Sequence, residues 1–182
     1  FTGSQLPIGD LRTDAKENLI TAIQIASLQE KGQPVIQEVS LYFEYKLYRG
    51  NRTTKISAEH FNAFASPNFP ELVESGVHLN INNEVLLKQK KSNKLKVNTN
   101  FDNNVLILKL FPGININILH AILHTPKLKG VVLETYGSGN APMENWFIDE
   151  IENAIKRGVH IVNVTQCSGG NVLMGAYETS TR

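Results

Sequence analysis

VLILKLFPGININILHAILHTPKLKGVVLETY, residues 105–136, is the stretch that decides the fold class of this chain. It opens with a continuous apolar run at 105–111, places apolar residues at helical spacing over 116–123, and closes with a second apolar run at 129–136. A buried strand, a helix and another buried strand in this order are typical of a βαβ unit with parallel strands. We therefore predict an α/β fold with a parallel sheet in this half of the chain.

The same pattern continues after this stretch. A helix is predicted from Glu144 to Arg157, and the apolar residues 159–164 predict a third strand. Ligands of such sheets gather outside the carboxyl ends of the strands. The loops of interest are therefore PGIN at 112–115, GSGNAP at 137–142 and TQCSGG at 165–170. By topology alone, Asn140 and Thr165 lie at this edge of the sheet.

The first part of the chain mixes helix and strand signals. Apolar residues at helical spacing predict a helix over residues 14–31, with Thr13 or Asp14 as its N-cap. Residues 36–43 alternate enough to predict a strand, and residues 45–48 either continue it or pair with it. Further along, HFNAF and ELVESG, between residues 57 and 80, are consistent with short helical turns.

A polar stretch rich in lysine and asparagine separates the two parts. We expect a linker at residues 83–103 between domains at 1–82 and 104–182. Five lysines stand between residues 88 and 96 without one acidic residue. They form either a phosphate-binding tract or a solvated linker, and the absence of interleaved aromatic residues favours the linker.

The composition is that of an ordinary globular protein, with 41% hydrophobic and 19% charged residues. A formal net charge of +1 gives no electrostatic argument for a nucleic acid, a membrane or a strongly acidic partner. No apolar run reaches the roughly 18–20 residues that a membrane span needs. The single cysteine, Cys167, excludes an intramolecular disulfide and suits a reducing compartment.

Several patterns could carry chemistry but favour a structural interpretation. His120 and His124 stand four residues apart on a predicted helix, a spacing that suits a metal, but no glutamate follows the first histidine and no third ligand is near in sequence. We therefore expect no metal site. GSGN falls short of a dinucleotide-binding fingerprint because Pro142 occupies the last glycine position, so a tight turn that presents Asn140 is favoured over a phosphate site. Cys167 has no sequence-adjacent base that would make it a nucleophile.

The segment RGNRTTK, residues 49–55, is different in kind because it packs two arginines, two threonines and a lysine at the end of a predicted strand. Lys55 could be held against a carboxylate or a hydroxyl. A lysine in a desolvated site can lose its proton and assist a hydroxyl nucleophile. From the residues alone, a solvated basic loop remains the favoured interpretation.

Five segments together change that balance. They are TGSQLPIGDLRTDAKENL at 2–19, RGNRTTK at 49–55, FNAFASPN at 61–68, YGSGNAP at 136–142 and NVTQCSGG at 163–170. In this order they resemble the pattern of the bacterial cytoplasmic, or type I, L-asparaginases, over almost the whole chain. The resemblance implies two α/β three-layer units, namely the back part of a larger N-terminal domain and a smaller C-terminal domain with a parallel sheet.

The resemblance also implies a chemistry and a set of residues. Members of the family hydrolyse L-asparagine to L-aspartate and ammonia in the cytoplasm, without a metal or organic cofactor, through a threonine nucleophile and a Thr-Lys-Asp triad. Lys55 matches the triad lysine, Ser4 matches a position that lines the substrate pocket, and Asn140 matches a residue that approaches the active site of a neighbouring subunit. The family assembles as a dimer of dimers, so the expected partners are L-asparagine and further copies of the same protein.

The resemblance also implies that some members of the family share a second, regulatory asparagine pocket. In that pocket a threonine, a cysteine and an arginine meet. Thr54 and Cys167 match the first two positions, but Glu134 stands at the third. A carboxylate there repels the carboxylate of an amino-acid ligand. We therefore expect regulation by asparagine to be weakened or lost.

Two family motifs are absent from these 182 residues: the TGGT motif of the nucleophile, and the Thr-Asp-Thr motif that carries the second threonine and the triad aspartate. We expect the chain to be a piece of a longer enzyme and to be inactive by itself. Two rivals stay open. One is the asparaginase-like subunit of a transfer RNA-dependent amidotransferase, and the other is a non-catalytic binding module with a truncated asparaginase fold.

Overall fold

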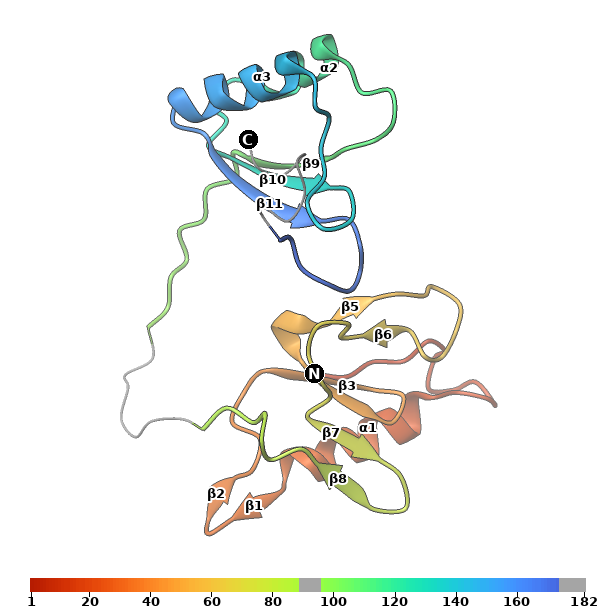
Figure 1. Ribbon diagram of the computed structural model, residues 1–182. Coiled ribbons are helices and arrows are strands. Elements are labelled where there is room, and N and C mark those ends of the chain that lie inside the picture. Colours follow the sequence, from red (N-terminus) through yellow and green to blue (C-terminus); the bar gives the residue numbers. More distant parts are fainter. Residues whose placement is uncertain (89–95, 174–182) are drawn as a thin grey trace. The chain divides into compact units, whose positions relative to one another are not determined.

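The structure, a computed structural model, describes residues 1–88 and 96–173, and the chain divides into two compact units, residues 1–94 and 95–182 (Figure 1). Of the expected linker at 83–103, residues 89–95 lie outside the described residues, and residues 96–103 form neither helix nor strand. Helices, antiparallel sheets and a parallel sheet occur together, which confirms the mixed α/β class. Among the described residues, no helix is long and apolar enough to cross a membrane.

The second unit is built around the expected parallel sheet. Its strands β9 (Val105–Lys109), β10 (Gly130–Thr135) and β11 (His160–Thr165) lie in the order β11-β10-β9, all parallel. Helix α2 (Ile116–Leu123) connects β9 to β10, and α3 (Asn145–Lys156) connects β10 to β11. The predicted succession of strand, helix, strand, helix and strand is therefore confirmed.

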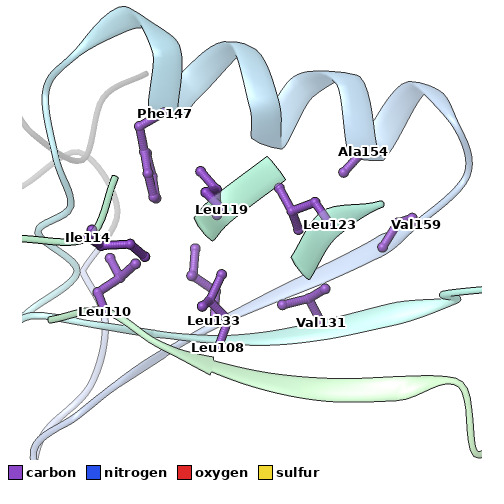
Figure 2. Close-up of a cluster of buried hydrophobic side chains, with 10 residues drawn as sticks. All are labelled: Leu108, Leu110, Ile114, Leu119, Leu123, Val131, Leu133, Phe147, Ala154 and Val159. Atoms are coloured by element: carbon purple, nitrogen blue, oxygen red, sulfur yellow. The ribbon is translucent and has the colours of Figure 1, made fainter. Parts of the chain in front are cut away.

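Both helices pack on the same face of this sheet, and alternate strand residues point toward them (Figure 2). Fully burying one leucine or valine side chain stabilises the fold by about 1.5–3 kcal/mol. The buried residues of this cluster are Leu108, Leu110, Ile114, Leu119, Leu123, Val131, Leu133, Phe147, Ala154 and Val159. The opposite face carries exposed side chains, among them Ile107, which is 68% exposed.

The ends of the helices follow from the local sequence. The side chain of Asn115 accepts a hydrogen bond from the backbone N–H of Ile118 at 3.2 Å and so caps the start of α2. The chain leaves α3 at Gly158, whose φ of 89° lies in the left-handed region that glycine adopts without strain. The start of α2 and the end of α3 therefore coincide with residues suited to those positions.

The first unit combines helix α1 (Ala15–Ala26) with short antiparallel strands. Four of them form one sheet in the order β3-β4-β7-β8, with bounds Ser40–Phe43, Lys46–Arg49, Val73–Ser75 and Leu79–Ile81. Two further pairs are β1 (Gln29–Glu30) with β2 (Gln33–Pro34), and β5 (Thr54–Lys55) with β6 (Phe64–Ala65). A 3₁₀ turn, η1 (Gly50–Arg52), separates β4 from β5.

The predictions for this unit are confirmed in part. The helix expected over 14–31 ends at Ala26, and residues 46–49 pair with residues 40–43 instead of extending them. Glu44 and Tyr45 form the turn between these strands, with φ angles of 45° and 67°.

The helical turns expected in HFNAF and ELVESG are wrong, because these segments supply strands β6 and β7. Val73 pairs with Leu47 on one side and Ile81 on the other. Pairing with distant strands therefore overrides the local sequence signal there.

Candidate active-site residues

Lys55 lies on β5, where it is the cross-strand partner of Phe64 on β6. Its side chain is exposed, and its Nζ donates a hydrogen bond to Oε1 of Gln5 at 3.2 Å. The same ammonium group lies 5.8 Å from the centre of the Phe64 ring, within reach of a cation–π contact. Lys55 thus meets an amide oxygen and an aromatic ring, whereas the sequence predicted a carboxylate or hydroxyl partner.

Gln5 connects three segments around Lys55. Besides accepting from Lys55, its side-chain Nε2 donates to the backbone carbonyls of Ala58 at 3.1 Å and His60 at 2.9 Å. Because Ser4 directly precedes Gln5, the segment that carries Ser4 lies beside Lys55. The structure therefore brings together the segments of two of the expected site residues, by way of a glutamine that the sequence analysis did not single out.

Asp14 fixes the position of this N-terminal segment. Its carboxylate accepts hydrogen bonds from the backbone N–H groups of Gln5 and Leu6, at 3.0–3.2 Å, and from the side chain of Asn18 at 3.2 Å. Asp14 precedes α1, as expected of an N-cap, but its side chain bonds to residues 5 and 6 instead of capping the helix. Asp14 is therefore a positioning residue for the segment of Ser4 and Gln5.

Arg49, the first residue of the basic segment, has a structural role. Its guanidinium forms a two-pronged ion pair with Glu38, donates to the carbonyl oxygen of Val85 at 2.8 Å, and lies 4.1 Å from the centre of the Phe69 ring. Burial alone would raise the pKa of the Glu38 carboxyl, but hydrogen bonds from Arg49 and from the Leu87 amide outweigh it and hold this pKa below its usual value. With Arg49 engaged in this way, Thr54 and Lys55 are the exposed residues at the end of the segment.

Asn140 lies in a tight turn after β10. The backbone N–H of Tyr136 donates to the carbonyl of Asn140 at 2.9 Å, and the N–H of Asn140 donates back to the carbonyl of Tyr136 at 2.8 Å. Gly137 and Gly139 have φ angles of 49° and 121° within this turn. A Cβ atom on Gly139 would lie only 2.9 Å from Cγ1 of Val172, so glycine is required there for space as well as conformation.

Side chains tie the carboxyl ends of the three parallel strands together. Gln166 follows β11, and its Nε2 donates to the carbonyls of Leu110 at 2.6 Å and Glu134 at 2.8 Å. The hydroxyl of Thr165 donates to the carbonyl of Gly137, and Thr165 Oγ1 also accepts from the N–H of Cys167 at 3.0 Å. The loops after the three strands are therefore linked by hydrogen bonds at one edge of the sheet. Gln166, which the sequence analysis did not single out, makes the bonds to the ends of β9 and β10.

The residues expected at a regulatory pocket fall in both units. Thr54 lies in the first unit and is exposed, whereas Cys167 and Glu134 lie in the second. The Cys167 side chain is exposed. Glu134 is half-buried on β10, where its cross-strand partner on β9 is Lys109.

Two family models match the chain. Residues 1–87 match "Asparaginase, N-terminal", and residues 104–182 match "Glutaminase/Asparaginase C-terminal domain". Together they account for nearly all of the sequence. The two matched stretches lie in the two compact units of the structure.

Comparisons with individual proteins point to the same family. The chain is 40% identical over 178 residues to L-asparaginase 1 of Escherichia coli K12, which covers 98% of this chain and 51% of that protein. It is 43% identical over 172 residues to the 60 kDa lysophospholipase of Mus musculus, covering 94% of this chain and 29% of that protein. The crystal structure of L-asparaginase I from Vibrio cholerae superposes with a TM-score of 0.84 at 36% identity, covering 96% of this chain and 51% of that one.

A more distant relative is a subunit of the glutamyl-tRNA(Gln) amidotransferase of Saccharolobus solfataricus, 29% identical over 187 residues, covering 98% of this chain and 40% of that protein. In every one of these comparisons, this chain spans about half or less of the length of its relative.

Proposed function

The chain belongs to the asparaginase family, and on this premise we propose that the whole protein hydrolyses L-asparagine to L-aspartate and ammonia. The match to L-asparaginase 1 over 98% of this chain supports the proposal most directly. The amidotransferase subunit is the weaker candidate, because the identity to it is 29%.

In the proposed reaction, Lys55 takes the proton of a threonine hydroxyl. The hydroxyl oxygen attacks the side-chain amide carbon of asparagine. The C–N bond then breaks, and the nitrogen leaves as ammonia with the proton that Lys55 gives up. Water then hydrolyses the acyl-enzyme ester, releasing aspartate and restoring the hydroxyl. The threonine is supplied from outside these 182 residues, which contain neither family threonine motif. We therefore expect the 182-residue chain by itself to release no ammonia from asparagine.

Lys55 is exposed, so its amine is accessible to a threonine hydroxyl and to an aspartate supplied by other segments. In the described part of the chain, its side-chain partner is the neutral amide oxygen of Gln5 and no carboxylate forms an ion pair with it. The Gln5 contact holds the amine in place.

Ser4 and Asn140 complete the proposed site. Ser4, next to Gln5, is a substrate-binding residue on the segment that Asp14 positions. Asn140 acts on the active site of a neighbouring subunit in a dimer of dimers, presented by the glycine turn at 136–140. We also propose a cytoplasmic location, for which the single free cysteine is the support from this chain.

Substitution of Lys55 tests the proposal. In the whole protein, Lys55→Met should lower the turnover number for ammonia release by at least about 10²-fold, with a smaller change in KM, because general-base assistance acts on the transition state. Lys16→Met is the matched control, since Lys16 is an exposed lysine on α1. Near wild-type turnover in Lys55→Met, with an unchanged circular dichroism spectrum, would contradict the proposed role.

The identity to a 60 kDa lysophospholipase carries a second candidate function, the hydrolysis of a lysophospholipid ester. An ester carbonyl can be attacked by the same activated hydroxyl. Release of fatty acid from lysophosphatidylcholine, measured beside ammonia release from asparagine, separates the two. Fatty-acid release that Lys55→Met abolishes, without ammonia release, would favour the second candidate.

A further inference from the structure

A cluster of two histidines and one glutamate lies between α2 and α3 in the second unit. His120 and His124 stand one turn apart on α2, and their rings stack with centres 3.7 Å apart and planes inclined by 24°. Nδ1 of His120 lies 3.0 Å from Oε1 of Glu150 on α3, and Nδ1 of His124 lies 3.9 Å from Oε2 of the same carboxylate. The third ligand that the sequence analysis found missing therefore comes from a different helix, thirty residues away.

Glu150 occupies a position of α3 that otherwise faces the core. It lies three residues after Phe147 and four before Ala154, both of them buried, so it belongs to the same helical stripe. Its side chain is only 13% exposed, and among the described residues its buried Oε2 atom has no hydrogen-bond partner. A buried carboxylate oxygen without a partner destabilises the fold unless a cation compensates it.

The histidines leave the cluster open to solvent. Their side chains are 55% and 38% exposed, so an ion can reach the ring nitrogens without unfolding either helix. Nδ1 of His124 also lies 2.9 Å from the carbonyl oxygen of His120, a contact that a metal bond would replace. Arg157, just after α3, donates to the carbonyl of Leu123 at 3.1 Å, and its guanidinium forms no ion pair with Glu150 among the described residues.

The distances suit a small divalent ion. With metal–ligand bonds of about 2.0–2.1 Å, donor atoms of a tetrahedral zinc site lie roughly 3.3 Å apart. The two nitrogen–oxygen distances of 3.0 and 3.9 Å lie on either side of that value. Donor atoms of all three residues lie within 4.8 Å of one another.

We propose that His120, His124 and Glu150 form a site for one Zn²⁺ ion that clamps α2 to α3, with water completing the coordination. Two imidazoles and one carboxylate suit zinc and neighbouring transition metals, whereas Ca²⁺ and Mg²⁺ require more oxygen ligands than this cluster offers. The ion compensates the buried carboxylate oxygen and joins two helices that both cover the same face of the sheet. The site is independent of the proposed amidase reaction.

The test is direct binding of zinc to the 182-residue chain. Isothermal titration calorimetry with ZnCl₂ should give one ion per chain, and Co²⁺ should give visible absorption bands typical of a four-coordinate site. His120→Ala, His124→Ala and Glu150→Gln should each weaken zinc binding at least tenfold. Zinc should also raise the melting temperature of the wild-type chain and have less effect on Glu150→Gln, a near-isosteric variant chosen to preserve the fold.

Two controls make the result specific. His160→Ala removes an exposed histidine of the same unit, and Cys167→Ser removes an exposed thiol, which is another potential zinc ligand. Both should bind zinc as the wild type does, and CaCl₂ and MgCl₂ should give no binding at the same concentrations. Absence of zinc binding at micromolar concentrations would overturn the proposal. Equal affinity in Glu150→Gln, or loss of binding in either control, would overturn it too.

Discussion

At the scale of single residues, the basic segment at 49–55 separates into two roles. Arg49 is held by Glu38, Val85 and the Phe69 ring, whereas Lys55 is exposed and meets Gln5. The sequence indicated that this segment was unusual and singled out Lys55. It could not indicate that Arg49 is structural, because its partners lie 11 to 36 residues away and carry no local signal.

Loss of the Glu38 charge should destabilise the first unit. The side chains of Arg49 and Glu38 are 14% and 4% exposed, so Glu38→Gln leaves a largely buried guanidinium without its anion. We expect the free energy of unfolding to fall by on the order of 3 kcal/mol. Urea denaturation at neutral pH measures this. Glu59→Gln, at an exposed position, serves as the control, and an equal effect in both would contradict the structural role.

The same pair implies a pH dependence with a definite sign. The pKa of Glu38 is lower in the folded chain than its ordinary value of 4.5, so the folded state binds this proton less readily than the unfolded state does. Its stabilising contribution is therefore complete above that ordinary value and is lost as the pH falls through the folded pKa. The wild-type chain should lose more stability than Glu38→Gln between pH 6 and pH 3.

At the scale of elements, long periodic segments were predictable and very short strands were not. The predicted helix 116–123 has the same bounds as α2, because its apolar spacing and its Asn115 cap are both local. Strands β6 and β7 span only two and three residues, too few to show a period of two, and they exist through pairing with β5, β4 and β8. The sequence indicated the two histidines of the cluster but not Glu150. A glutamate on the apolar stripe of the predicted helix 144–157 was the signal that could have identified the third residue.

The turn at 136–140 depends on glycine at position 139. Gly139→Ala should lower the free energy of unfolding by about 1–3 kcal/mol, because φ is 121° there and the new Cβ would meet Val172. Gly158→Ala is the matched control, since Gly158 also has a positive φ, of 89°, but a Cβ atom added there would meet nothing within 4 Å. Thermal unfolding of both variants compares them, and a smaller loss in Gly139→Ala than in Gly158→Ala would show that the contact with Val172 carries no cost.

At the scale of the whole molecule, Asn140 should act only in the assembled protein. If its target lies in a neighbouring subunit, a Lys55→Met subunit and an Asn140→Ala subunit each lack a different part of a shared site. Mixed oligomers contain some sites with both parts intact. We therefore expect mixing of the two inactive whole-protein variants to restore part of the ammonia release. No recovery, with mixed oligomers confirmed by native mass spectrometry, would place Asn140 in the site of its own subunit.

Regulation by asparagine depends on what replaces the arginine of the family pattern. That position is Glu134, which is half-buried on β10. A guanidinium would clamp the ligand's carboxylate with two charge-assisted hydrogen bonds, whereas a carboxylate repels it. Two like charges in close contact at a partly buried site cost on the order of a few kcal/mol, which exceeds a modest ligand affinity. Lys109, the cross-strand partner of Glu134, is a cation at the neighbouring position of the sheet, but its ammonium is a point charge without the arginine fork.

The rate of the whole protein should consequently depend on asparagine concentration along a hyperbola, with a Hill coefficient close to one. A second asparagine molecule that does not bind cannot bias an equilibrium between two conformations. Initial rates of ammonia release over a wide range of asparagine concentrations measure this. Thr54→Val should leave the shape of the curve unchanged, because the pocket it would damage already binds no asparagine. A sigmoidal wild-type curve that Thr54→Val makes hyperbolic would show instead that Lys109 or another cation replaces the missing arginine and that regulation is retained.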